Sequence, residues 1–443
     1  MMHKQWKRLL AVFLAAMLVL GACGGRDDDD DAAPPVDDTP TDPADDNDEP
    51  TDDPPGDPEP VSGFDGETIS LGVLTPTSGD VAIIGDPLTA GNQAYIDYVN
   101  EELGGIAGQY QIELIIEDTA YDPTTAGQRY SAIRDDVVAF LQVLGTPITN
   151  AVLPDLIDDN MIAIPASLDS AWVGEDNLVS LGGPYQIQAI NGIDWWYTQE
   201  GNEDDTLCTL ASDDEYGDTG VEGAEFAAEN LGIDIAVGAE YPAPSATRPA
   251  QTFESQLSQL ESGGCDVVLF VATPSDTAPL TTALEESAYN PTVIGVSPTW
   301  LGLFANFGYL QENFYLASEG PEYGDESVPG MAELVRIRET YTPDQAPDLY
   351  FNFGYLQAVA MVEILEVAVA NGDLSRDGIR YALENVGTLE FGGLSGDYAH
   401  GAAEDRVPPV VSSIFRPDPE VDMGLAIVAQ DYEADYVGDF AFD

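Results

Sequence analysis

The chain has 443 residues, of which 81 are acidic and 13 basic, and its formal net charge is −68 at pH 7. Residues 24–62 hold 16 of the acids, so 65 acidic side chains and nine arginines follow Ser62. The net charge of this part is nine minus 65, or −56. This excess excludes nucleic-acid binding, because phosphates would meet no cationic surface, and it opposes docking on anionic lipids. We interpret it as adaptation to concentrated salt, which screens repulsion between carboxylates; the alternative is an ordinary acidic extracellular protein.

Residues 1–22 have the pattern of a signal peptide. A basic patch over residues 3–8 precedes an apolar run over 9–20, which is too short to span a bilayer. The sequence Leu-Gly-Ala-Cys over residues 20–23 resembles the lipobox of bacterial lipoproteins. We therefore expect cleavage before Cys23 and a lipid anchor on that residue. A signal anchor, or a secretory leader with an incidental cysteine, is the alternative.

Residues 23–62 are rich in aspartate and proline and almost free of apolar side chains. Such a segment cannot bury enough surface to offset the entropy of ordering. We predict a disordered tether that holds the folded part away from the membrane.

From about residue 67, short apolar runs alternate with amphipathic stretches, which is typical of parallel sheets flanked by helices. The first series predicts strands over 69–74, 112–117, 137–144 and 161–165, with helices over 87–103, 123–135 and 150–158. The second predicts helices over 185–199, 220–230, 250–262 and 277–288, with strands over 206–212, 234–239, 266–272 and 292–296. Helices over 329–341, 350–370 and 375–385 follow, and short strands end the chain. The length and the two series predict two lobes.

Cys208 and Cys265 are the cysteines that remain after the lipidation site. Both stand near the starts of predicted neighbouring strands, and an exported protein meets an oxidising environment. We propose a disulfide between them; two buried free thiols are the alternative.

Four segments, taken in order over about residues 67–400, carry a family resemblance. They are the segment that begins ISLGVLTPTSGD, then DDEYGDTGVEG, GGCDVVLF and FNFGYLQAVAMVEIL. Together they resemble the branched-chain amino acid (Leu/Ile/Val)-binding proteins, which have the type I periplasmic binding protein fold. The resemblance implies an α/β protein with two Rossmann-like lobes, parallel sheets and three hinge crossovers. It places residues 67–187 plus 318–400 in lobe 1 and 188–317 plus 401–443 in lobe 2.

The resemblance also implies a ligand site between the lobes, where loops after the strands present free N–H groups. The Thr149 loop, preceded by Ile148, would hold the α-carboxylate of the ligand, aided by the dipole of a helix that begins near Asn150. Residues Ala166, Ser167 and Leu168 would add backbone contacts. From the other side, Tyr216 would close over the ligand and Ile84 would cover its side chain. Trp300 is a candidate aromatic platform.

The sequence departs from the family at the group that binds the ligand ammonium. The family has an acidic residue just before an Asp-Phe pair, whereas this chain has Gln251 and Thr252 before Phe253. Asp213, Asp276 or Glu322 could replace it, or the ligand could lack an ammonium, as amides, urea and aromatic carboxylates do.

Other features are weak signals for chemistry. Residues 104–108 are glycine-rich, but they follow a predicted helix and precede a strand, the reverse of a phosphate-binding loop. After the leader, His400 is the remaining histidine, so a nucleophilic relay would depend on it alone. The Asp-rich run lacks the spacing of a calcium loop, and Trp195 with Trp196 fits a helix core better than a sugar platform. We expect no enzyme activity, metal or cofactor.

These observations predict a lipid-anchored solute-binding protein on the outer face of the cytoplasmic membrane. It would capture an amino acid or a related small polar solute and deliver it, as a monomer, to the permease subunits of an ABC importer. A ligand-sensing receptor for amides, urea or small carboxylates is the alternative, since the same fold serves receptors.

Overall fold

A computed structural model describes residues 56–200, 203–245 and 248–442. The predicted signal peptide, the lipidation site Cys23 and the tether up to residue 55 lie outside the described residues. The tether was predicted to extend to Ser62, but residues 61 and 62 already make hydrogen bonds with the folded part. Val61 exchanges backbone hydrogen bonds with Phe64, and the Ser62 hydroxyl donates to the carbonyl of Asp135.

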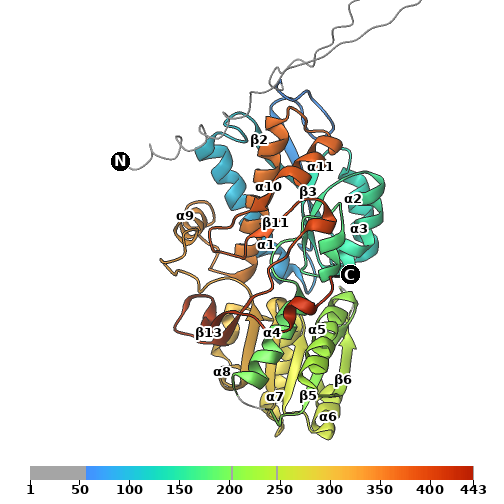
Figure 1. Cartoon of the computed structure of the whole chain (residues 1–443), viewed down its shortest axis with the longest axis vertical. Coiled ribbons are helices and arrows are strands. Elements are labelled where there is room, and N and C mark those ends of the chain that lie inside the picture. Colours follow the sequence, from blue (N-terminus) through green and yellow to red (C-terminus); the bar gives the residue numbers. More distant parts are fainter. Residues whose placement is uncertain (1–55, 201–202, 246–247, 443) are drawn as a thin grey trace, which may run out of the picture. The chain divides into compact units, whose positions relative to one another are not determined.

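The first sheet has four parallel strands in the order β2-β1-β3-β4. Helices on both of its faces explain why β1 and β3 are almost wholly buried. Three later helices, α9 to α11, return to this sheet, and together these elements form the first lobe (Figure 1). Its elements are β1 (Thr68–Thr75), α1 (Ala82–Tyr98), a π-helical turn (Val99–Leu103), β2 (Gln111–Asp118), α2 (Pro123–Ile133), β3 (Ala139–Leu144), α3 (Thr146–Asp158), β4 (Ala163–Ala166), α9 (Met331–Tyr341), α10 (Leu349–Ala370), α11 (Arg376–Asn385), β10 (Thr388–Leu389) and β11 (Tyr398–Ala399).

The second sheet has seven strands in the order β13-β12-β9-β8-β7-β5-β6. Strands β5 to β9 are parallel, whereas β12 and β13 add an antiparallel edge. Its elements form the second lobe: α4 (Tyr185–Thr198), β5 (Leu207–Asp213), α5 (Glu215–Leu231), β6 (Ile235–Pro242), α6 (Glu254–Gly263), β7 (Val267–Val271), α7 (Pro274–Glu286), β8 (Thr292–Val296), α8 (Gly308–Asn313), β9 (Phe314–Ser318), β12 (Ser412–Pro417) and β13 (Leu425–Tyr432). Cys208 on β5 and Cys265, just before β7, form a disulfide with an Sγ–Sγ distance of 1.98 Å. Short 3-10 turns cover Ser170–Gly174, Ser297–Thr299, Gly302–Asn306, Ala403–Asp405, Asp422–Gly424 and Val437–Asp439.

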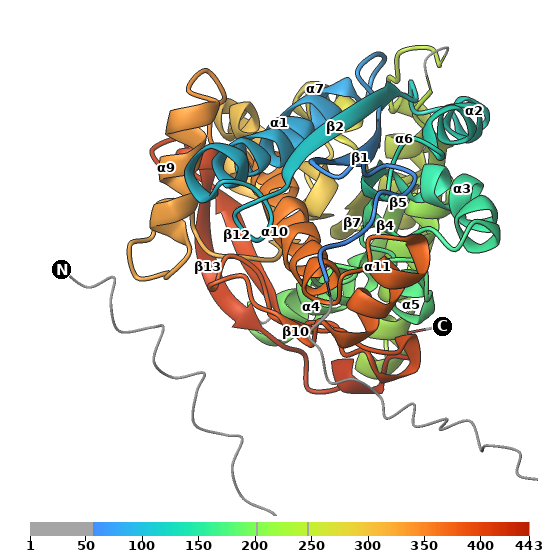
Figure 2. The same cartoon turned by 90° about the horizontal axis from the view of Figure 1, so that it is seen from above.

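Helix α10 is apolar enough to cross a membrane by length and composition, with a mean hydropathy of 1.6. Here it is a core helix of the first lobe, packed against α1 (Figure 2). Glycines allow the close approach: a Cβ on Gly354 would lie 1.9 Å from the carbonyl oxygen of Leu88, and one on Gly91 would lie 2.1 Å from that of Phe351. The Asn92 amide donates to the Gly354 carbonyl at 2.7 Å, which satisfies a buried polar group between the helices.

Several helices begin earlier than the sequence predicted. Helix α1 begins at Ala82 and contains Pro87, which we had placed at its start. Helices α3 and α7 have proline in their first turn, at Pro147 and Pro274, where the missing N–H has no partner to lose. The predicted helices over 150–158 and 277–288 began after these prolines, and the start of α3 was predicted four residues too late. That error matters for the binding site.

Three crossovers join the lobes, near residues 182–184, 318–321 and 407–411. The α/β fold class with two lobes of mainly parallel sheet is confirmed. Strand β9, which runs into the second crossover, was not predicted.

Candidate ligand-binding site

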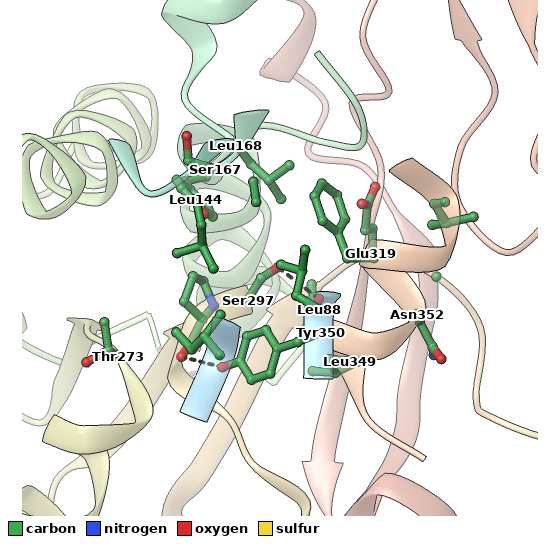
Figure 3. A pocket seen from close by; sticks show the side chains of 18 of the residues that line it. Leu88, Leu144, Ser167, Leu168, Thr273, Ser297, Glu319, Leu349, Tyr350 and Asn352 are labelled. Atoms are coloured by element: carbon green, nitrogen blue, oxygen red, sulfur yellow. Dashed lines mark hydrogen bonds between the residues drawn. The ribbon is translucent and has the colours of Figure 1, made fainter. Parts of the chain in front are cut away.

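A pocket lies where strands of both sheets end at their carboxyl edges, the usual ligand position in open α/β sheets (Figure 3). First-lobe walls come from the ends of β3 and β4 and from α1 and α10; second-lobe walls come from the ends of β7 and β8 and from α5. Five of the predicted ligand residues line it: Ile84, Ala166, Ser167, Leu168 and Tyr216.

The first turn of α3 forms one polar end of the pocket. Gly145 precedes the helix with a φ of +107°, and a Cβ there would lie 2.5 Å from the Tyr121 ring, so glycine is required. Thr146 lines the pocket and is 1% exposed, and its hydroxyl has no hydrogen-bond partner among the described residues. In this first turn Pro147 has no N–H and the Thr149 N–H donates to the Gly145 carbonyl at 2.8 Å, so the N–H groups of Thr146 and Ile148 are the ones without an intrahelical acceptor. The helix dipole favours negative charge at this end. This end can hold an anion.

The segment after β4 forms the adjoining wall. The Ser167 hydroxyl accepts a hydrogen bond from the indole N–H of Trp172 at 2.9 Å, and the Leu168 carbonyl accepts one from the Tyr185 N–H at 2.7 Å. These contacts fix the segment, and they leave the hydroxyl proton of Ser167 free to donate toward the pocket.

Two tyrosines connect the pocket to the second lobe. Tyr216 is buried, donates its hydroxyl to the Ala272 carbonyl at 3.2 Å and packs edge-on against Tyr185. Burial raises the pKa of Tyr216 well above its ordinary value, so it stays neutral. The Tyr350 hydroxyl on α10 lies 2.9 Å from the Pro298 carbonyl oxygen and 3.0 Å from that of Trp300, which links the two lobes at the pocket floor (Figure 3).

Three predicted ligand residues do not line the pocket. Because α3 begins at Thr146, Ile148 and Thr149 lie inside the helix and are completely buried, instead of in the preceding loop. Trp300 is 1% exposed, stacks on Phe314 and donates its indole N–H to the Met423 carbonyl at 2.9 Å. Trp300 is thus a core residue and not a ligand platform.

The acidic candidates for an ammonium partner also lie elsewhere. Asp213 is exposed, and Glu322 is partly buried beside the Ile427 N–H. Asp276 is fully buried, but Arg248 neutralises it at 2.8 Å. None of these three lines the pocket.

Glu319, which sequence reasoning missed, is the acidic residue among the described residues that line the pocket. It stands on the second crossover, and its Oε2 accepts hydrogen bonds from the Gly183 N–H of the first crossover at 2.8 Å and from the Ser395 hydroxyl, in the first-lobe loop between β10 and β11, at 3.1 Å. Burial raises the pKa of Glu319, and these two bonds oppose that rise. One carboxylate therefore ties the first and second crossovers to a loop of the first lobe. Its position after β9, the strand not predicted, is the only sequence signal that could have found it.

The side chains singled out as weak chemical signals are structural. The His400 Nε2 lies 3.0 Å from the Ser180 carbonyl oxygen, and burial with the nearby Arg406 charge lowers the pKa of His400 to about 3. Trp195 and Trp196 pack on Tyr315 from α4. Among residues 56–442, apart from the four masked ones, no cluster of three or more histidine, cysteine or acidic side chains could hold a metal.

Two α/β lobes with three crossovers and a pocket between their strand ends define a hinged solute-binding protein. A family model described as periplasmic binding protein matches residues 68–410, and the chain belongs to that family. Its members bind substrates and are not enzymes.

The relatives agree with this assignment. The chain is 26% identical over 233 residues to Leu/Ile/Val-binding protein homolog 3 of Brucella melitensis; the match covers 51% of this chain and 60% of that relative. The chain thus spans about three fifths of the length of the curated relative. A fatty acid ABC transporter substrate-binding protein from Thermomonospora curvata has a TM-score of 0.79 and 26% identity, covering 87% of this chain and 97% of that one. A structure of a branched chain amino acid ABC transporter from Thermus thermophilus with bound valine has a TM-score of 0.72 and 16% identity, and the match covers 85% of this chain and 99% of that one. At this identity the likeness supports the fold alone.

Proposed function

We propose that this chain is an extracytoplasmic lipoprotein, anchored through Cys23, that captures a small solute and delivers it to the permease subunits of an ABC importer. Family membership and the pocket between two hinged lobes support this proposal. Lobe closure on a bound solute gives a transporter a distinct state to recognise. The observation that carries it is the buried pocket formed by strand ends of both lobes.

The solute is of the amino-acid or related carboxylate class. The first turn of α3 and Thr146 hold its carboxylate, Ser167 donates its hydroxyl, and the backbone of Ala166 and Leu168 completes this end. Ile84 and Tyr216 close over the rest. The relatives named above, a Leu/Ile/Val-binding protein homolog and a fatty acid ABC transporter substrate-binding protein, both take their names from carboxylates.

Thermal-shift screening in molar salt tests this proposal. Amino acids, amides, urea and small carboxylates are compared, because a ligand that binds only the native state raises the melting temperature by mass action. At least one carboxylate is expected to raise it, and failure of all of these solutes would count against the proposal.

Two threonines three residues apart on α3 provide a matched pair of variants. Both hydroxyls lack a partner among the described residues, but only Thr146 lines the pocket. Thr146→Val is expected to weaken binding of the identified carboxylate by roughly ten- to a hundredfold, since a hydrogen bond to a charged group contributes about 1.5 to 3 kcal/mol. Thr149→Val is expected to leave the affinity unchanged. Equal effects of the two variants would refute the placement of the carboxylate.

A further inference from the structure

The pocket continues away from α3 into an apolar region that the carboxylate site does not explain. Its walls there come from α9, α10, the loop that holds Leu394 and the 3-10 turn over Asp422–Gly424. Apart from Asn352, whose Nδ2 lies 3.7 Å from the Met423 Sδ, the side chains named here are hydrocarbon or thioether: Met331, Leu334, Leu356, Leu394, Phe353 and Met423. Met331, Leu334 and Leu356 are buried, with exposed fractions of 2%, 0% and 5%. In both Figures 1 and 2, α9 and α3 lie on opposite sides of α1 and α10.

The two ends of the pocket belong to different cores. Ile84, Leu88 and Leu144 pack in the hydrophobic cluster that reaches the α3 end, whereas Met331 and Leu334 pack in the cluster centred on α10. In Figure 3, Leu88 and Tyr350 lie between Leu144, at the end of β3, and Asn352 on α10. Thr146 and Ser167 make the α3 end of the pocket polar, and the lining beyond Leu88 is mainly apolar.

The acidic group of the pocket lining is turned toward the hinge backbone. The Oε2 of Glu319 accepts hydrogen bonds from Gly183 and Ser395, and a Cβ on Gly182 would lie 2.1 Å from its Oε1. Asn352, the amide in the lining, has a buried Oδ1 without a partner among the described residues, but an amide oxygen carries no full charge to pair with an ammonium, and the side chain is directed away from the other labelled side chains (Figure 3). An unpaired ammonium beside leucine and methionine side chains would carry a large desolvation penalty.

Resting on the proposed function, we infer that the solute is a monocarboxylic acid with an unbranched hydrocarbon chain and not a zwitterionic amino acid. Its carboxylate lies at the first turn of α3, and its chain passes Leu88 and Tyr350 toward Met331 and Leu334. The side chains of α9 and Leu394 form the end wall that limits chain length.

Calorimetric titration in molar salt with alkanoates of four to twelve carbons, and with leucine, tests the inference. Affinity is expected to rise roughly fourfold per methylene, the value of burying one CH₂ group, and then to stop rising when the chain reaches the end wall. Leucine is expected to bind at least tenfold more weakly than the best alkanoate.

Two positions on α9 separate chain-length selection from a general packing effect. Leu334 and Ile337 are both 0% exposed, but only Leu334 lines the pocket. Leu334→Phe is expected to weaken the binding of decanoate at least tenfold, while the affinity for hexanoate changes less than threefold. Ile337→Phe is expected to leave the ratio of the two affinities unchanged. Met331→Phe gives the same test if Leu334→Phe does not fold.

The outcomes separate this inference from the proposed function. Tight binding of leucine without binding of alkanoates would overturn the inference and leave the proposed function standing. Affinity that does not depend on chain length, or equal effects of Leu334→Phe and Ile337→Phe, would also overturn it. A folded protein that binds no solute of any class would remove the proposed function, and the inference with it.

Discussion

Arg248 forms a buried ion pair whose removal should strongly destabilise the second lobe. Its guanidinium lies 2.8 Å from Asp276, and the two side chains are 6% and 0% exposed. Burial raises the pKa of Asp276, while Arg248 and the Thr273 hydroxyl, at 3.1 Å, oppose the rise. Arg248 also lies 3.6 Å from Asp80 of the first lobe, but that carboxylate is 47% exposed and contributes little.

The expected magnitude follows from burial. Arg248→Met leaves Asp276 buried without its cation, and breaking such a pair costs about 3 to 5 kcal/mol of unfolding free energy. In the variant, the folded-state pKa of Asp276 rises further above its unfolded value, so the native state binds the proton more tightly. Its stability then falls as pH rises above about 4, and the deficit should be smaller at pH 5 than at pH 8.

Urea unfolding of the wild type, Arg248→Met and the double variant Arg248→Met/Asp276→Asn, in molar salt at both pH values, measures these effects. Asparagine keeps the shape of Asp276 and its contact with Thr273 without a charge. The double variant should therefore recover to within about 1.5 kcal/mol of the wild type, since a well-packed neutral replacement of a buried pair is often near neutral. If it is as unstable as Arg248→Met, the loss comes from arginine packing and the electrostatic reasoning is wrong.

Three further predictions concern stability. Replacing Cys208 and Cys265 by alanine should lower the unfolding free energy by about 4 kcal/mol, because the disulfide closes a loop with a sequence separation of 57; unchanged urea midpoints would contradict this. Glu319→Gln should raise the melting temperature at pH 7, since glutamine still accepts from Gly183 and Ser395, and the gain should vanish at pH 4, where the wild-type carboxyl is protonated. Raising the salt concentration from 0.1 M to 3 M should raise the melting temperature, because the Debye length falls from about 10 Å to below about 3 Å and repulsion between the surface carboxylates is screened. A melting temperature that does not change with salt would contradict the interpretation of the net charge of −68 as adaptation to concentrated salt.

Much of the fold could be predicted because it depends on local patterns. Short apolar runs and amphipathic patterns located most strands and helices, and the long apolar helix over 350–370 differs from α10 by one residue at its start. Helix starts were less accurate where proline lies in the first turn, since proline is compatible with both a loop and a first helical turn. At α3 this ambiguity led us to predict Thr149 as the pocket residue, whereas Thr146 lines the pocket.

The sequence by itself determined the alternation of strands and helices, the acidic charge and the family, because these are written in local patterning and in ordered motifs. Tertiary structure decided which side chains meet. Glu319 reaches Gly183 and Ser395, which are 136 and 76 residues distant in the chain, only because the tertiary fold brings the crossovers beside the loop of Ser395. Likewise, the packing of α9 and α10 beside the cleft, and not the composition of either helix, gives the pocket its apolar end.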